Sequence, residues 1–447
     1  MSKEIEQIKD RLDIVDLVGS YIKLDKAGKN YKAKCPFHGE KTPSFMVSPE
    51  RQSFYCFGCQ AKGDIFEFVQ KFEGLEFKEA LKILAERTGV ELKQYKQENK
   101  DEESKKERLL KVLEEATQIY ENLLGCGNQM STNEEVMKYL EDRGLKEETI
   151  KKWRIGWAPL EWRTILNELI TKGFKEGALL DAGLVKKTED KTKTYDVFRG
   201  RIMFPIFDIS GRVIAFSGRI LIPQGASLVT KEAPWGEAPK YVNSPETELF
   251  KKSETLYGLH LAKSEIRRLD YTVLVEGQID LVLSHQAGVK NTVASSGTAL
   301  TESHLKKIQK LSNRCIVACD ADTAGKAAAR RSGELALSLG MEVKIASLPE
   351  GEDPASVIQK SENEWKELLK NSVNLVEFAL DEAVRKHSKQ TELIKEFHKS
   401  VLLLLSSIQG EMLRSEMVSL ASKKTKISEK SIWSDLERLN KSLRSQD

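Results

Sequence analysis

Residues 314–331, RCIVACDADTAGKAAARR, combine a short apolar run, two aspartates and a helix-like segment. The run CIVAC is rich in β-branched and small apolar residues, which favours a buried strand. Asp320 and Asp322 follow it two residues apart, so an extended chain would place both carboxylates on one side. Carboxylate oxygens are the ligands preferred by Mg²⁺ and Mn²⁺. We therefore expect a metal site at the carboxyl end of this strand.

The same alternation of short strand and helix continues on both sides of this stretch. YTVLVEG (271–277), NTVASSG (291–297) and MEVKIASLP (341–349) are each separated by helical segments, which predicts a mostly parallel α/β sheet. Glu276 ends the first of these strands, and LPEGEDPAS (348–356) supplies Glu350, Glu352 and Asp353 after the last. Open α/β sheets bind ligands at this edge, so we expect a shared divalent-metal site there.

A plainer alternative is that these acids have no metal. Asp320 and Asp322 could cap the following helix, since Asp is favoured at helix starts, and Glu276 could be a surface residue. The joint placement of the acids at adjacent strand ends favours the metal site.

A second metal site is predicted near the N-terminus, in CPFHGEKTPSFMVSPERQSFYCFGC (35–59). Cys35 and His38 form one close pair and Cys56 and Cys59 another, with 17 residues between the pairs. Four nitrogen and sulfur ligands complete the tetrahedron of a structural Zn²⁺ site. Four unrelated residues are the alternative. The remaining cysteines read differently: Cys315 and Cys319 are expected to share a buried face of the strand, and Cys126 carries no signal.

Aromatic and basic residues are interleaved around the zinc ligands. The rings could pack the core of a small zinc ribbon, or they could stack on the bases of a single nucleic-acid strand while cations neutralise its phosphates. The sequence leaves both possibilities open. The rings are Tyr31, Phe37, Phe45, Phe54, Tyr55 and Phe57, and the cations are Lys32, Lys34, Lys41, Arg51 and Lys62.

The rest of the chain is mainly helical. Residues 64–92 show helical apolar spacing that ends near Gly89, and residues 93–108 are a solvated linker or the start of a long helix. From Leu109 the pattern is helical through GWAPLEWRTILNELITKGF (156–174) to AGLV (182–185). YDVFRGRIMFPIFDISGRVIAFSGRI (195–220) predicts two strands around a turn at 208–211, with Pro205 at an edge or bulge. Beyond Ala355 we expect helices, including a buried one at 401–408.

Composition limits the class of protein. The 447 residues are 31% charged and 40% hydrophobic, with a net charge of +3, so two to four globular domains are expected and a nucleic-acid surface must come from local clustering of cations. No apolar run approaches the roughly 18 residues of a membrane span, and the charged N-terminus does not resemble a signal peptide. We expect a cytoplasmic protein, where clustered thiols bind metal.

In combination, the Cys-His-Cys-Cys ribbon, the basic region and VEGQID…ACDADTAG…EDP resemble bacterial DNA primase, from the N-terminus to about residue 437. The resemblance implies a zinc-binding domain joined to an RNA polymerase domain with a Toprim fold. It assigns the catalytic metal ligands to Glu276, Asp320, Asp322 and, less directly, Asp353, with Asp280 as a further acidic position. It assigns nucleotide or template binding to Arg143, Arg199, Arg201, Arg219, Lys240, Tyr241, Asn243 and Lys252.

The resemblance has two departures. The family commonly has Asp after the Pro of its third acidic motif, and here that residue is Ala355, which weakens the third metal position unless Glu350, Glu352 or Asp353 compensates. The family also carries a further helical domain that binds the replicative helicase, and we expect that domain to be absent from this chain. A helicase partner is therefore not carried over.

The predicted organisation is an α/β multidomain chain with five parts. They are a zinc ribbon (1–93), a charged linker (94–112), a basic mixed α+β subdomain (113–255), a Toprim parallel-sheet subdomain (256–360) and a helical subdomain (361–447).

The predicted function is synthesis of short RNA primers on single-stranded DNA from ribonucleoside triphosphates, using one structural Zn²⁺ and two or more Mg²⁺ or Mn²⁺ ions. Asp320, Asp322 and Asp353 would bind the catalytic metals, with Glu276 as ligand or proton acceptor, and Arg201 and Lys240 would neutralise the triphosphate. We expect a monomer at the replication fork. The alternatives are a Toprim nuclease, a topoisomerase, for which no tyrosine nucleophile is evident, or a non-catalytic zinc-ribbon module that binds single-stranded DNA.

Overall fold

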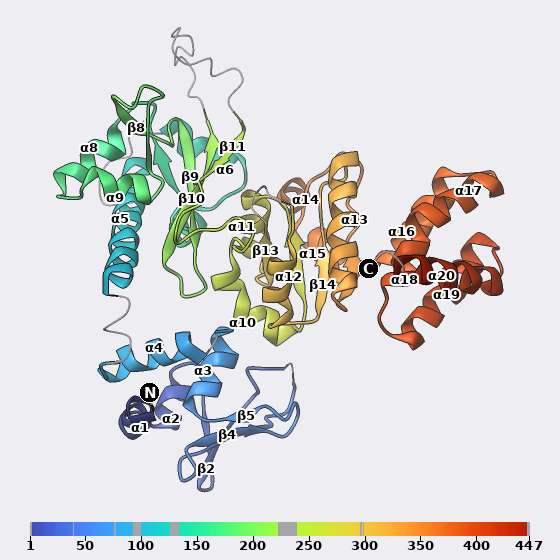
Figure 1. Cartoon of the computed structure of the whole chain (residues 1–447), viewed down its shortest axis with the longest axis horizontal. Helices are drawn as coiled ribbons and strands as arrows, with labels where there is room; N and C mark the ends of the chain where they lie inside the picture. The colour runs from blue at the N-terminus through green and yellow to red at the C-terminus, as the bar shows by residue number, and fades with distance from the viewer. Residues whose placement is uncertain are drawn as a thin grey trace. The chain divides into compact units, whose positions relative to one another are not determined.

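The computed structural model describes residues 2–38, 40–75, 77–92, 100–125, 134–221, 239–295, 297 and 299–444. The chain separates into two compact units, residues 1–270 and residues 271–447. The predicted fold class is confirmed: an N-terminal zinc ribbon, a mixed antiparallel-sheet region, a Toprim sheet that is mostly parallel and a helical C-terminal part (Figure 1). The finer division into five parts remains a prediction.

The N-terminal part of the first unit is a five-stranded antiparallel sheet with helices packed on it. Its strands pair in chain order, and the two-residue turn between the first two contains Gly28 with φ of 65°. One face of the sheet joins a core that includes Phe45, Phe54 and Phe68. The elements are α1 (Ser2–Arg11), α2 (Ile14–Gly19), β1 (Asp25–Ala27), β2 (Asn30–Ala33), β3 (Phe45–Ser48), β4 (Ser53–Cys56), β5 (Lys62–Gly63), α3 (Ile65–Glu73) and α4 (Phe77–Thr88).

The helical prediction for 64–92 is confirmed, and the segment forms two helices rather than one. Asp64 begins α3 with a capping box. Its carboxylate accepts a hydrogen bond from the backbone N–H of Glu67, and the carboxylate of Glu67 accepts one from the backbone N–H of Asp64. Gly74 then ends α3 in the left-handed conformation, and α4 stops just before Gly89, which is also left-handed. Residues 93–108 were expected to be either a solvated linker or the start of a long helix. The structure has a helix from Lys100 onward, and residues 93–99 lie outside the described residues.

The rest of the first unit is built on a four-stranded antiparallel sheet of order β11-β10-β9-β6, with a separate hairpin of β7 and β8. The amphipathic helix α5 packs its apolar side against β6 and β10. The strands are β6 (Gly156–Ala158), β7 (Val185–Lys187), β8 (Thr194–Asp196), β9 (Arg201–Phe207), β10 (Val213–Ile220) and β11 (Tyr241–Asn243). The helices are α5 (Lys100–Leu124), α6 (Glu134–Asp142), α7 (Glu147–Lys152), α8 (Thr164–Thr171), α9 (Glu176–Asp181) and α10 (Leu259–Leu269).

Two sequence-based expectations fail in this region. The start of GWAPLEW is the strand β6 rather than helix, and Val185 begins β7. Residues 156–158 form a strand because they pair with β9. That strand lies some 45 residues further along the chain, so the local spacing of apolar residues could not indicate the pairing. Gly156 also permits the close approach of α5, since a Cβ there would lie 2.5 Å from the backbone carbonyl carbon of Tyr120.

The predicted turn at 208–211 is confirmed, and Pro205 lies differently from the expectation. Strand β9 is internal, but β6 pairs only with residues 201–203, so Pro205 has β10 on one side alone. Its partner Phe216 directs its backbone N–H and C=O to Ser244 instead of to β9. The missing N–H of Pro205 therefore costs no hydrogen bond to β10. The irregularity in the pairing lies in β10, between Val213 and Ala215.

The second unit has the predicted sheet, of order β13-β12-β14-β15-β16, parallel except for the last strand. The strands are β12 (Thr272–Val275), β13 (Thr292–Ala294), β14 (Arg314–Val317), β15 (Glu342–Ile345) and β16 (Val373–Asn374). The helices between them are α11 (Gln278–Gln286), α12 (Glu302–Gln309), α13 (Thr323–Ser338), α14 (Pro354–Lys360) and α15 (Glu362–Lys370). The short β16 interrupts the region expected to be all helix, because it pairs with β15.

The C-terminal residues form helices that pack on one another, as Figure 1 shows for α16 to α20. The buried helix expected at 401–408 is confirmed: Leu402, Leu404 and Leu405 are buried, while Leu403 faces outward. A turn of π-helix precedes it. The elements are α16 (Leu375–Lys386), α17 (Gln390–Glu396), the π-helix (Phe397–Val401), α18 (Leu402–Ser407), α19 (Glu411–Thr425) and α20 (Glu429–Arg444).

Candidate functional site

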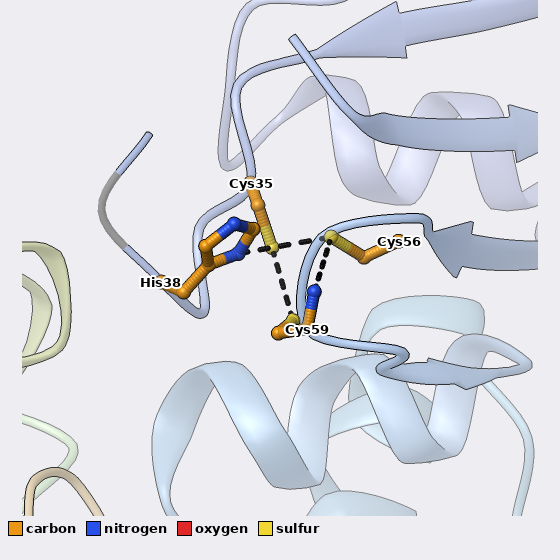
Figure 2. Close-up of side chains that lie close together, drawn as sticks. All are labelled: Cys35, His38, Cys56 and Cys59. Atoms are coloured by element: carbon orange, nitrogen blue, oxygen red, sulfur yellow. Dashed lines mark hydrogen bonds between the residues drawn. The ribbon is translucent and has the colours of Figure 1, made fainter. Parts of the chain in front are cut away.

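The four predicted zinc ligands converge in the first unit. The ligand atoms of Cys35, His38, Cys56 and Cys59 all lie within 4.8 Å of one another, and Figure 2 shows the four side chains pointing toward a common centre. Cys35 follows β2, whereas Cys56 ends β4 and Cys59 lies in the turn after it. The β-sheet pairing therefore brings the two sequence pairs together.

The spacing of the donors fits zinc. The sulfur atoms of Cys35 and Cys59 are 3.8 Å apart, and the sulfur of Cys56 is 3.7 Å from Nδ1 of His38. A tetrahedral ion with Zn–S bonds of about 2.3 Å separates two sulfur ligands by about 3.8 Å. Burial raises the pKa of the Cys35 thiol, so a cation at the centre is needed to hold its thiolate form.

Glu40 supports this cluster and was not singled out in the sequence. Its carboxylate accepts hydrogen bonds from the backbone N–H of Cys35 at 2.6 Å and of Ser44 at 3.0 Å. It also lies 3.3 Å from Nε2 of His38, which orients the ring with Nδ1 toward the sulfurs. Gly58 is needed for space, because a Cβ there would meet the His38 ring at 2.4 Å.

The aromatic residues of the ribbon divide into two sets. Phe45 and Phe54 are buried in the core, which accounts for the packing alternative. Tyr55 and Phe57 are exposed, by 38% and 71%, and their ring centroids are 4.9 Å apart. They line a groove of about 930 Å³ whose charged residues are the cations Lys29, Arg51 and Lys62 and the carboxylates Glu50, Asp64 and Glu67. These two rings are accessible beside cations, so base stacking stays a prediction for this part of the ribbon.

The predicted acids of the second unit lie at the carboxyl edge of its parallel sheet. Glu276 directly follows β12, Asp320 and Asp322 follow β14, and Asp353 follows β15. One hydrogen bond joins the loops after β14 and β15: the N–H of Ala321 donates to the carbonyl of Glu352 at 3.0 Å. Within the first of these loops, Gly325 allows the first turn of α13 to approach Asp320. A Cβ at Gly325 would lie 2.3 Å from the Asp320 carbonyl oxygen.

Two of these acids also cap helices, as the plainer alternative expected. Oδ1 of Asp322 accepts from the N–H of Gly325 at 2.6 Å, and Oδ1 of Asp353 accepts from Ser356 at 2.6 Å. A capping bond occupies one oxygen of a carboxylate, so Oδ2 of each remains a candidate ligand. Oε1 of Glu276 is buried and has no hydrogen-bond partner among the described residues, which is the expected state of an oxygen that awaits a cation.

Asp280 joins the loop after β12 to the start of α14 through two hydrogen bonds. Its two oxygens accept the N–H of Gly277 at 3.1 Å and the N–H of Ala355 at 3.2 Å. Burial, together with the nearby carboxylates of Asp353 and Asp320, raises the pKa of Asp280 to about 7. The residue at the departure from the family pattern, Ala355, is thus a buried helix residue whose backbone binds Asp280. Glu352 is paired with Lys360.

The expectation of two core thiols is half correct. Cys315 lies in β14 and is 1% exposed, whereas Cys319 lies beyond the end of the strand and is only partly buried. Burial and the adjacent carboxylate of Glu276 raise the pKa of the Cys319 thiol. The strand ends at Val317, so the period-two argument does not extend to Cys319. Cys126 lies outside the described residues.

Two predicted basic residues lie on neighbouring strands of the first unit. Arg219 in β10 pairs with Tyr241 in β11, and its guanidinium carbon is 4.8 Å from the centre of the Tyr139 ring. Arg201 in β9 is buried, and its guanidinium donates to the carbonyls of Gly218 at 2.9 Å and Pro239 at 3.1 Å.

The other predicted binding residues are spread over loops. Lys240 follows Pro239 and is exposed, Asn243 pairs with Ser217, and Arg143 and Lys252 are half-buried in the turns after α6 and before α10. Arg199 stacks on Trp162, with its guanidinium carbon 3.6 Å from the ring centre, and lies 5.2 Å from the Tyr195 ring. Trp162 is 44% exposed and was missed, although it stands beside Arg163 in the sequence.

Comparisons with known proteins agree with this arrangement. Residues 1–100 match the CHC2 zinc finger family, residues 126–263 match the N-terminal domain of the DNA primase catalytic core, and residues 273–358 match a Toprim-like family. The DNA primase of Clostridium acetobutylicum is 34% identical over 438 residues, which cover 96% of this chain and 69% of that protein. The chain belongs to the DNA primase family.

Other members support the same family. The DNA primase of Halalkalibacterium halodurans is 37% identical over 378 residues, covering 84% of this chain and 60% of that protein. A crystal structure of the Aquifex aeolicus primase, comprising its zinc-binding and RNA polymerase domains, is 32% identical with a TM-score of 0.62 and covers 96% of this chain and 98% of that one. A primase catalytic domain bound to single-stranded DNA is 30% identical, with a TM-score of 0.61, covering 73% of this chain and 99% of that one.

The chain corresponds to only part of the length of its curated relatives. The chain spans 69%, 60% and 52% of the length of three curated relatives. The Cys/His cluster and the matching zinc-finger family together identify a zinc site, and the Toprim-like match implies a divalent metal at the acidic edge. Among the described helices, none is both long enough and apolar enough to cross a membrane.

Proposed function

We propose that this chain synthesises short RNA primers on single-stranded DNA from ribonucleoside triphosphates. The observation that carries the proposal is the acidic edge of a Toprim sheet, with Glu276, Asp320, Asp322 and Asp353 after three adjacent strands, in a chain of the primase family. Acids spread along a sheet edge suit phosphoryl transfer, which depends on positioning and charge more than on covalent chemistry by the protein.

Asp320, Asp322 and Asp353 would hold two or more Mg²⁺ or Mn²⁺ ions, with Glu276 as a further ligand or as the acceptor of the proton from the attacking hydroxyl. When bound, such ions would stabilise the negative charge on the attacking 3′-oxygen and on the departing pyrophosphate. The capping bonds use only Oδ1 of each aspartate, which leaves Oδ2 as a candidate ligand, and the buried Oε1 of Glu276 also supports this assignment. Asp280 would keep their loops in place through Gly277 and Ala355.

The basic residues of the first unit would bind the template and the triphosphate. We assign phosphate contacts to the exposed Lys240 and to Arg143, Arg219 and Lys252, with Tyr241 and Asn243 beside them on β11. The stack of Arg199 on Trp162 supports contact with an unpaired base or its phosphate. The burial of Arg201 and its bonds to Gly218 and Pro239 favour a positioning role, holding the segment that carries Lys240.

The zinc ribbon would hold the template strand. Its zinc is structural, because all four positions of the tetrahedron are filled by the protein, and the exposed rings of Tyr55 and Phe57 would stack on bases beside Lys29, Arg51 and Lys62. We further propose that the chain acts as a cytoplasmic monomer at the replication fork.

The decisive experiment is incorporation of labelled ribonucleotides on single-stranded DNA with Mg²⁺ or Mn²⁺. The parent should make short RNA products, and Asp320→Asn should reduce them by about 100-fold or more while DNA binding persists, since it removes charge at the reacting phosphate. Asp10→Asn, at an exposed position of α1, is the matched control and should retain activity.

Three outcomes would contradict the proposal. If the parent binds DNA but makes no RNA and leaves the template intact, the chain is a binding module. Degradation of the template instead indicates a nuclease. Full activity in Asp320→Asn would place the catalytic metals elsewhere.

A further inference from the structure

The second unit contains a pocket at the edge of the parallel sheet opposite the acids. It lies at the amino ends of β14 and β15, next to α15, and has a volume of about 340 Å³. Ligand pockets in proteins typically measure about 300–1,000 Å³, so this one is large enough for a small molecule. None of the residues that line it belongs to the acidic edge.

The sheet contributes an unusual surface to this pocket. Arg314 and Ile316 alternate along β14, Glu342 and Lys344 alternate along β15, and the pairs Arg314–Glu342 and Ile316–Lys344 are directly in register. The four side chains therefore share one face of the sheet. Strands of a parallel sheet covered by helices are normally apolar on both faces, so charged residues here indicate a face that is open to water or to a polar ligand.

Helix α15 forms the other wall. Lys366, Leu369 and Lys370 are spaced three and four residues apart, which places them on one side of the helix, and all three line the pocket. The helix is anchored from behind by Trp365, which is fully buried and donates from Nε1 to Oγ of Ser284 at 3.0 Å. The wall is thus fixed without any ligand.

The lining is apolar at its base and positive around it. Ile316, Leu369 and Val289 are buried apolar residues at the base. Among the charged residues, Arg314 faces Glu342 across the two strands. Lys370 lies 3.4 Å from the carboxylate of Glu367.

Two further positive charges line the pocket, those of Lys344 and Lys366. In the part of the chain that the structure describes, neither Lys344 nor Lys366 forms an ion pair with a carboxylate. Lys344 is half-buried, whereas Lys366 is exposed, and a lysine can pack its stem on apolar residues while its ammonium group stays accessible to a ligand. Two uncompensated ammonium groups beside an apolar base match a ligand with about two negative charges and an apolar body.

We propose that this pocket binds a small organic phosphate monoester of mononucleotide size. Its dianion would lie between Lys344 and Lys366, since a phosphate monoester carries about −1.5 to −2 at neutral pH. Its flat apolar body would rest on Ile316 and Leu369, with the ring of Tyr271 at the rim. The volume, at the lower end of the range for ligand pockets, favours one nucleotide over a dinucleotide. The proposal does not depend on the proposed function.

The test is equilibrium binding of AMP to the full chain by isothermal titration calorimetry, without added Mg²⁺ or Mn²⁺. AMP should bind more tightly than adenosine, which lacks the phosphate, and than inorganic phosphate, which lacks the apolar body. The double variant Lys344→Glu/Lys366→Glu should weaken AMP binding at least tenfold. Lys395→Glu, an equal charge change at an exposed position of α17, should leave it within twofold.

Two more variants separate this pocket from other sites. Ser372→Trp, which fills the pocket without changing charge, should also weaken AMP binding while the thermal unfolding of the chain is unchanged. Asp320→Asn should retain AMP binding. The proposal is overturned if AMP does not bind at millimolar concentration, if adenosine binds as tightly, if the double variant binds like the parent, or if Asp320→Asn abolishes binding.

Discussion

The zinc cluster and the acidic edge are both sets of metal-binding side chains, but they differ in how tightly their donors are held. The four Cys and His donors lie within 4.8 Å of one another, and in the described part of the chain the carboxylates of the acidic edge form no group of comparable tightness. A closed set of four donors leaves no position for substrate, so it can only stabilise structure. An open set of carboxylates leaves coordination positions for phosphate oxygens, as catalysis requires.

The supporting carboxylates of the two sites differ in the same sense. Although partial burial opposes ionisation, hydrogen bonds from Ser44 and the backbone of Cys35 hold the pKa of Glu40 below its usual range. Burial among other carboxylates raises the pKa of Asp280 to about 7. The environment of Glu40 thus favours its ionised form. The environment of Asp280 opposes ionisation, because that side chain is buried and other carboxylates lie nearby. This contrast can be tested at each site.

The largest effect is expected when a zinc ligand is removed. Cys56→Ser should release the zinc and unfold the ribbon, because the binding energy of a structural zinc, about 10 kcal/mol or more, is also folding energy of the module. The zinc content should fall from one ion per chain to none, and template use should be impaired, while the second unit remains folded by circular dichroism. Cys319→Ser is the matched thiol control and should keep its zinc. Stoichiometric zinc and full priming in Cys56→Ser would refute the four-ligand site.

The acidic edge should respond to pH through Asp280. Its pKa is raised in the folded chain, so the folded state holds this proton more tightly and the associated stability is present below about pH 4 and lost as pH rises toward 7. The difference of about three pH units corresponds to at most about 4 kcal/mol. Asp280→Asn should flatten this decline in urea unfolding between pH 4 and 7, without added Mg²⁺ or Mn²⁺.

Asp280→Asn should also be less stable than the parent at pH 4. An amide has one acceptor oxygen, so one of the N–H groups of Gly277 and Ala355 loses its partner. An unchanged slope between pH 4 and 7 in the variant would mean that another group produces the pH dependence.

The exposed rings should contribute to template affinity. Phe57→Ala should weaken binding of single-stranded DNA by about 1–3 kcal/mol, the cost of losing one stacked base, and zinc content should be unaffected because the ring is 71% exposed. Fluorescence anisotropy with a labelled oligonucleotide measures this. Met412→Ala, at an even more exposed apolar position, is the control. Equal affinities of parent and Phe57→Ala would show that the groove beside Tyr55 does not hold the template.

An effect of similar size is expected when the carboxylate that supports the zinc ligands is replaced. Glu40→Gln should weaken zinc binding about 10- to 100-fold, because the amide supports His38 and the Cys35 turn less well than the carboxylate does. Competition with a chromophoric chelator gives the affinity. Gln has a similar shape, so the ribbon should stay folded at saturating zinc. An unchanged zinc affinity would mean that the backbone turn alone orients His38.

Much of this arrangement could be predicted from local patterns. The Toprim strands could be predicted because each is a short apolar run followed by a helical segment. The acids could be predicted because they directly follow those runs. The β9–β10 hairpin was found from its turn at 208–211. The strand β6 (Gly156–Ala158) was not predicted, because its three residues are extended only through their pairing with β9, which lies far along the chain. Glu40 and Trp162 were missed because their roles appear only when distant segments meet.

By itself, the sequence determined the zinc ligands, the order along the chain of the four parallel strands in the second unit and the acids at its sheet edge, because these follow from residue types and their spacing. Only the tertiary structure decided which rings are core and which are exposed, that Arg201 is buried against backbone carbonyls, and that Asp280 lies among other carboxylates. Burial and electrostatic environment depend on contacts between segments far apart in the chain, and no local pattern records them.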